Sequence, residues 1–121
     1  MTLIEVMIAL TILATAMLSM AAYMTRLART VAVSDVRATA DEIAASRLEE
    51  VKGATRYATI DSAFAGTQAL AAPYQGFTRT TQVTHTGGGP SDFYDYKTIT
   101  VIVTNPRLPA PVRKTTVIAA F

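Results

Sequence analysis

The 121-residue sequence contains no cysteine and only one histidine. The missing cysteines exclude a disulfide framework, a thiolate metal site, a cysteine nucleophile and c-type haem attachment. The histidine, His85, has no serine in a nucleophile-elbow context to act with it. We therefore interpret His85 as a surface residue at the end of a strand, and we expect neither enzymatic activity nor a cofactor.

The first 25 residues lack lysine and arginine, and an acid, Glu5, stands near their start. A secretory signal peptide would begin with a basic region and have a shorter apolar core, so the polarity argues against one. Twenty consecutive residues between Glu5 and Arg26 carry no charge. As a helix they cover about 30 Å, the thickness of the hydrocarbon layer of a membrane. A helix that can span a membrane is therefore predicted over residues 1–25.

Residues 1–52 also lack proline and glycine, and Gly53 after Lys52 is typical of a helix end. This predicts one helix of about 50 residues, about 75 Å long. Beyond Arg26 the apolar residues recur at spacings that predict one apolar face, comprising Leu27, Val31, Val36, Ala40, Ile43, Leu48 and Val51. Arg47 and Glu50 are expected to pair on the solvated side. A coiled-coil stalk is the alternative, although a seven-residue repeat slips at Val36.

The remainder of the chain predicts a small antiparallel sheet. The segment 53–76 is rich in alanine and interrupted by glycine and proline, so it is expected to connect, with a short helix near Arg56 to Phe64. Three strands are predicted: an exposed or edge strand over 77–85, an alternating strand over 94–104 and a final strand over 112–121, with Phe121 in the core. The fold class is therefore α+β. Residues 1–25 form an apolar helix, and residues 26–121 form a head in which helix 26–52, loop 53–76 and sheet 77–121 pack together.

The opening residues, Met1-Thr2-Leu3-Ile4-Glu5-Val6 followed by an apolar helix, resemble the mature N-terminus of type IV pilins and pseudopilins. The family pattern is roughly F-T-L-I-E, and Met1 replaces the usual phenylalanine. The resemblance is specific over about 25 residues. It implies that a prepilin peptidase removes a short basic leader before Met1 and methylates the Met1 amine. It also implies the ladle-shaped pilin fold and a filament core built from the N-terminal helices, through Leu3, Ile4, Val6, Ile8, Leu10, Leu13 and Leu18.

The charge on Glu5 fits that resemblance on physical grounds. A carboxylate in apolar surroundings is driven toward its neutral form or must be held by a cation. The free amine of Met1 on a neighbouring copy is such a cation. Because both groups are satisfied only at one stagger of the two helices, the pair penalises wrong registers more than it adds stability. We interpret Glu5 as the residue that sets the register of assembly.

Two features of the apolar helix leave alternatives open. Many major pilins have glycine and proline in the middle of this segment, whereas this chain has Ala14 and Ala22. That departure resembles minor pilins, particularly the I-type pseudopilin and the V-type minor pilin. Thr11, Thr15 and Ser19 form a row of small hydroxyl residues on one side of the helix. The row is suited to close helix approach in a membrane, but hydroxyls bonded to their own backbone explain it equally well.

The resemblance implies a structural subunit that polymerises into a type IV pilus or pilus-like filament. Its partners would be copies of itself, the bacterial inner membrane before assembly, the prepilin peptidase and the pilus or type II secretion machinery. Its final location would be an extracellular filament. The first alternative is a minor pseudopilin that initiates assembly at the tip of a type II secretion filament. A third hypothesis is a single-span membrane protein with a ligand-binding head.

The sequence does not favour a metal site or a DNA-binding surface. Asp92 and Asp95 could bind calcium, but two carboxylates without a third oxygen-rich group make a poor site, so no metal is expected. DNA binding would need a basic strip, for which the candidates are Lys97, Arg107, Arg113 and Lys114. With a net charge of only +2, a solvated surface explains these residues better.

Overall fold

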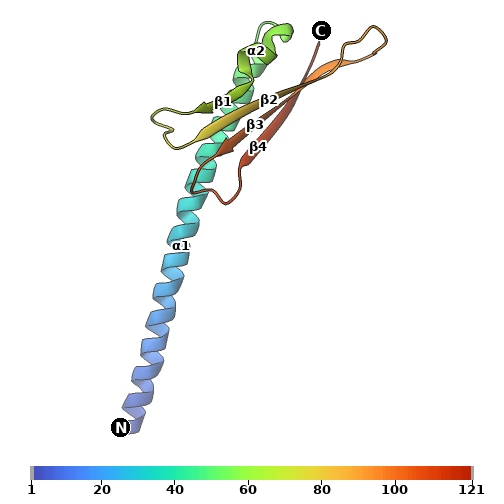
Figure 1. The fold of residues 1–121 in the computed structure, drawn as a ribbon. Helices are drawn as coiled ribbons and strands as arrows, with labels where there is room; N and C mark the ends of the chain where they lie inside the picture. Colours follow the sequence, from blue (N-terminus) through green and yellow to red (C-terminus); the bar gives the residue numbers. More distant parts are fainter. Residues whose placement is uncertain (1, 121) are drawn as a thin grey trace. The chain divides into compact units, whose positions relative to one another are not determined.

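The computed structural model describes residues 2–120 and consists of one long helix, two short ones and four strands (Figure 1). These elements are α1 (Leu3–Lys52), the 3-10 helix η1 (Tyr57–Thr59), α2 (Ile60–Phe64), β1 (Gly66–Ala69), β2 (Thr78–Gly87), β3 (Asp95–Thr104) and β4 (Val112–Ala119). The long helix packs on an antiparallel sheet, which confirms the α+β class. Internal contacts divide the chain into two units, one ending at Ser34 and one beginning at Asp35, and each is described separately.

The first unit is the N-terminal part of α1. Its side chains are exposed over nearly its whole length. By length and composition alone, α1 contains a window apolar enough to cross a membrane. The polarity of the sequence changes at Arg26, whereas the second unit begins only at Asp35. Residues 26–34 are therefore more polar than the preceding segment and yet lie outside the packed unit.

The second unit contains a four-stranded sheet in the order β1-β2-β3-β4, with every neighbouring pair antiparallel. The three predicted strands are present, and β1 is an additional one within the segment that we expected to be a loop. Its four residues, GTQA, are all exposed, so they have no alternation from which a strand is predicted. Because β1 pairs with β2, the expectation that 77–85 forms an edge strand is wrong. The predicted short helix near 56–64 is confirmed as η1 followed by α2.

The core lies between α1 and the inner face of the sheet. Helix α1 contributes Ala40, Ile43, Ala44, Leu48 and Val51, and strand β3 contributes Ile99, Val101 and Val103. Ile60 of α2, Phe77 and Val112 complete it. The alternation predicted for β3 is thus confirmed by its burial pattern. Phe121, which we expected in the core, lies outside the described residues.

The helical face that packs on the sheet differs from the prediction in two respects. Leu27 and Val31 are exposed, because the packed part of α1 begins near the half-buried Val36. Arg47, expected on the solvated side, is buried. It does pair with Glu50 at 2.7 Å, but its guanidinium also donates to the carbonyl of Phe64 and to Thr81. These acceptors replace the water that the buried charge has lost.

Candidate functional site

The apolar half of α1 is the most unusual surface of the chain. Between Leu3 and Met24, thirteen large apolar side chains are exposed. They include every residue predicted to pack in a helical core: Leu3, Ile4, Val6, Ile8, Leu10, Leu13 and Leu18. At about 1.5 kcal/mol for each side chain, covering them is worth about 20 kcal/mol. That exceeds the whole stability of a typical domain, about 5–15 kcal/mol, so this surface requires cover from lipid or from other protein chains.

Glu5 lies in the first turn of α1, where its carboxylate bonds to the start of the helix. Its Oε2 accepts from the backbone N–H of Thr2 at 3.3 Å, and the Thr2 hydroxyl accepts from the N–H of Glu5 at 3.4 Å. The pattern Thr-x-x-Glu is the capping box, in which two side chains satisfy two free backbone donors. We had not predicted a role for Thr2, although the spacing of Thr2 and Glu5 carries the signal. A neutral glutamine at position 5 would complete the same box.

The capping bonds leave most of the Glu5 carboxylate unused. Both are long for hydrogen bonds of their kind. An ionised carboxylate accepts about four hydrogen bonds, and Thr2 is the only donor to it among the described residues. Glu5 therefore has capacity for a second, charged donor on the same side chain. Met1, whose amine was the predicted partner, lies outside the described residues.

The row of small hydroxyl residues on α1 is bonded to its own helix. Thr11 donates to the carbonyl of Ile8 at 2.8 Å, Thr15 to that of Ile12 at 2.8 Å, and Ser19 to that of Ala16 at 2.9 Å. The hydroxyls thus need no partner from another helix, which supports the second of the two interpretations given above. Because these residues are small, another helix could still approach α1 more closely on this side than on the others.

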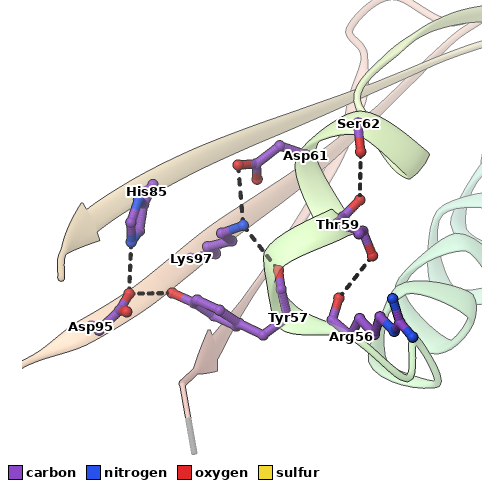
Figure 2. A network of polar contacts seen from close by, with 8 residues as sticks. All are labelled: Arg56, Tyr57, Thr59, Asp61, Ser62, His85, Asp95 and Lys97. Carbon is purple, nitrogen blue, oxygen red and sulfur yellow. Dashed lines mark hydrogen bonds and ion pairs between the residues drawn. The ribbon is translucent and has the colours of Figure 1, made fainter.

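A second group of polar residues lies at the β2–β3 end of the sheet, under η1 (Figure 2). Asp95 Oδ1 accepts from the hydroxyl of Tyr57 at 2.6 Å and lies 2.6 Å from Nε2 of His85. Lys97, one step along β3, donates to the carbonyl of Tyr57 at 2.9 Å and pairs with Asp61 at 3.1 Å. This network fastens the connecting segment onto two strands.

The network has a clear structural cause. His85 pairs with Lys97 and Gly87 with Asp95 across β2 and β3, in register with the buried residues of β3. At this end the sheet is covered by η1 and α2, whose backbone carbonyl and carboxylate groups favour polar partners. His85, expected at the surface of a strand end, is indeed half-exposed there, but it is bound to Asp95.

The hydrogen bonds of Asp95 affect its titration. The Tyr57 hydroxyl, and next the His85 ring, hold the pKa of Asp95 below its ordinary value of 3.8. Burial of Tyr57 and its bond to Asp95 raise the pKa of Tyr57 to about 12, so the phenol remains a donor throughout the neutral and acidic range. The folded state therefore favours the ionised form of Asp95. Its contribution to stability is complete above the unfolded pKa, near 4, and is lost as the pH falls through the lower folded value.

We expect Tyr57→Phe to lower the free energy of unfolding at pH 7, because the main hydrogen bond to Asp95 is lost while the aromatic ring over Lys97 is kept. The difference from the parent should narrow as the pH falls below about 4, where the parent loses the same contribution. Urea unfolding of the full chain in mild detergent, at pH 7 and at pH 3, measures both values. A difference that is equal at the two pH values would contradict the role assigned to the ionised Asp95.

Lys97 is buried, which overturns the suggestion that it belongs to a basic strip. Its side chain is 4 % exposed, and the ammonium lies over the ring of Tyr57. Lys114 is half-buried, and its ammonium lies 4.0 Å from the carboxylate of Asp41 on α1. Arg107 and Arg113 remain exposed, one in the loop after β3 and one on β4. Lys97 therefore cannot contribute its charge to an exposed basic strip.

We expect Asp61→Asn to lower the free energy of unfolding by about 1–3 kcal/mol, because it leaves the buried Lys97 ammonium without its counter-charge. Glu49→Gln is the matched control, since Glu49 pairs with the exposed Lys52 at a similar distance, 2.9 Å. That variant should cost less than about 1 kcal/mol. Denaturant unfolding of both variants makes the comparison. If the two variants lower the free energy of unfolding equally, burial does not strengthen the Lys97–Asp61 ion pair.

The two carboxylates considered for calcium have other partners. Asp95 is bound by Tyr57 and His85, and Oδ2 of Asp92 accepts from the backbone N–H of Gly89 at 3.0 Å. Within residues 2–120, no three metal-binding side chains come together in a way that could hold an ion. The carboxylates are thus used to shape and fasten the β2–β3 hairpin.

Comparison with known proteins gives no relative for this chain: no family model, no curated protein and no solved structure matches it.

Proposed function

We propose that this chain is a structural subunit that polymerises, through its N-terminal helix, into a type IV pilus or pilus-like filament. The observation that carries the proposal is the coupling of an acid to an otherwise uncharged apolar helix. Glu5 stands at the start of a run that exposes thirteen large apolar side chains, and it retains capacity for a charged donor. A plain membrane anchor has no need of such an acid, which is costly in lipid.

In this mechanism the subunits first lie in the inner membrane, which covers the apolar half of α1. During assembly the helices leave the lipid and cover one another, so the apolar surface remains out of water throughout. The Glu5 carboxylate of one copy pairs with the N-terminal amine of a neighbour, and only one stagger of the helices satisfies both groups. The packed unit beginning at Asp35 then forms the outer layer of the filament.

The second candidate is a minor pseudopilin that primes assembly at the tip of a type II secretion filament. It is favoured by one observation: α1 is helical without interruption through Ala14 and Ala22, where many major pilins have glycine and proline. Such a subunit would use the same N-terminal pairing but would enter short complexes with other subunits.

Expression of the chain behind a prepilin leader, in cells that have the assembly machinery, tests these candidates. The filament subunit should give fibres in which this chain is the only pilin, visible by electron microscopy and identified by mass spectrometry. Short complexes that always contain other pilins would favour the tip subunit instead. If the chain remains a monomer in the membrane and enters neither assembly, both candidates are wrong.

A further inference from the structure

The loop between β2 and β3 carries an aromatic residue that no other described residue covers. Phe93 is fully exposed, with a relative accessibility of 103 %, and the neighbouring Tyr94 is 56 % exposed. Phe93 therefore contributes no burial to the stability of the isolated chain, and it would gain from cover by another surface. Phe93 is the most exposed of the large apolar residues in the packed unit.

The loop that carries Phe93 is built to present it. The N–H of Gly88 donates to the carbonyl of Tyr94 at 3.0 Å, and the N–H of Asp92 donates to that of Gly89 at 3.1 Å. Gly87 has a φ of 85°, and a Cβ there would overlap the Tyr94 carbonyl oxygen, so only glycine fits. The turn is therefore closed by its own hydrogen bonds and holds Phe93 outward.

A cleft lies at the opposite end of the same unit. It has a volume of about 300 Å³ and is lined by Val36, Phe77 and Pro106, with Gln75 and Arg107 among its polar residues. Strand β3 separates the two features, because the hairpin loop precedes Asp95 and the loop with Pro106 follows Thr104 (Figure 1). At about 3.3 Å per residue they are about 30 Å apart, so Phe93 cannot enter the cleft of its own chain.

The charges next to the two features are complementary. Asp92 immediately precedes Phe93, and the exposed Arg107 lines the cleft. An arginine beside an aromatic ring also gains a cation–π contact. We propose that Phe93 of one copy docks in the cleft of a second copy, with Asp92 beside Arg107.

Such a contact joins two different surfaces of the same chain. A contact of this kind generates a closed ring where the rotation between copies closes and an open helical array where it does not, and the open array is the one that fits the proposed filament. It therefore links the outer layers of successive subunits along a filament, independently of the N-terminal pairing. The inference rests on the proposed function for its second copy, but it adds an interface that the N-terminal helix does not provide.

Cysteine crosslinking tests the docking directly, because the chain has no cysteine of its own. We choose Ser91→Cys in the hairpin loop and Gln75→Cys at the cleft, both exposed positions that leave Phe93 in place. Mild oxidation of fibres from the double variant should give a ladder of dimers, trimers and larger species on a denaturing gel. Each single variant should stay monomeric.

Four substitutions in that double-cysteine background, two of them controls, examine the chemistry of the contact. Phe93→Ala should reduce the ladder about tenfold, as loss of a central aromatic does at an interface. Val117→Ala, which removes another exposed apolar side chain, should leave it unchanged. Arg107→Glu should reduce the ladder through repulsion of Asp92, whereas Arg107→Lys should retain it.

The outcomes separate this inference from the function on which it rests. Fibres that form normally and give no ladder would overturn the docking and leave the filament subunit standing. Dimers from Ser91→Cys alone would show that hairpin meets hairpin, which also overturns it. Failure of the parent chain to form fibres would overturn the proposed function and the docking together.

Discussion

Glu5→Ala is expected to abolish fibre formation and to leave membrane insertion intact. Removal of one partner of a buried charge pair costs about 3–5 kcal/mol, because the other charge stays unpaired in apolar surroundings. That cost recurs at every contact between subunits, so a long polymer cannot form. Insertion should be unaffected, since the twenty uncharged residues after Glu5 remain. Electron microscopy of sheared fibres and fractionation of membranes measure the two properties.

Two further variants separate the charge of Glu5 from its bond to Thr2. Glu5→Gln keeps a side chain that can complete the capping box but has no charge, so it too should give no fibres. Thr2→Val loses the capping hydroxyl and keeps the Glu5 charge. It should cost about 1 kcal/mol at the helix start and still assemble. Normal fibres from Glu5→Gln would mean that Glu5 acts as a helix cap and that its charge plays no part in assembly.

Ile99→Ala is expected to have the largest effect on the folding of the head. Ile99 is fully buried in β3, between Val83 and Thr116 of the neighbouring strands. Truncation of a buried isoleucine costs about 2–5 kcal/mol through lost burial and the cavity left behind. For a small core this is a large part of the total stability. Urea unfolding of the full chain in mild detergent measures the cost. The unfolding is monitored by the near-ultraviolet circular dichroism of the five tyrosines.

The control for that prediction is Val117→Ala. Val117 lies in the neighbouring strand β4 and is 58 % exposed, so its truncation should change the free energy of unfolding by about 0.5 kcal/mol or less. A similar cost for both variants would show that the inner face of β3 is not the centre of the core.

The helix and strand that have a clear pattern in their own sequence were predicted correctly. The long helix follows from the absence of breakers before Gly53, and β3 follows from the alternation of Ile99, Val101 and Val103. Strand β1 has no such pattern, because all four of its residues are exposed. It exists because β2 offers a free edge, and that edge becomes known only once the sheet is formed.

The burial of two charged side chains was also not predicted, because it too depends on residues distant in sequence. Arg47 and Lys97 both look like surface residues, and the groups that satisfy them are distant in sequence. The carbonyl of Phe64 lies 17 residues from Arg47, and that of Tyr57 lies 40 residues from Lys97. No local pattern indicates such pairs. Glu5, in contrast, stood out because its surroundings in the sequence are almost uniformly apolar.

The hydroxyls that bond back along α1 have a mechanical consequence. Each takes a share of a carbonyl that the helix backbone also uses, and such sharing weakens and bends helices. Thr11, Thr15 and Ser19 place three shared carbonyls within about two turns. This segment should therefore be more compliant than the rest of α1, even without glycine or proline. A fibre built on it would yield there first when stretched, and recover as the backbone bonds re-form.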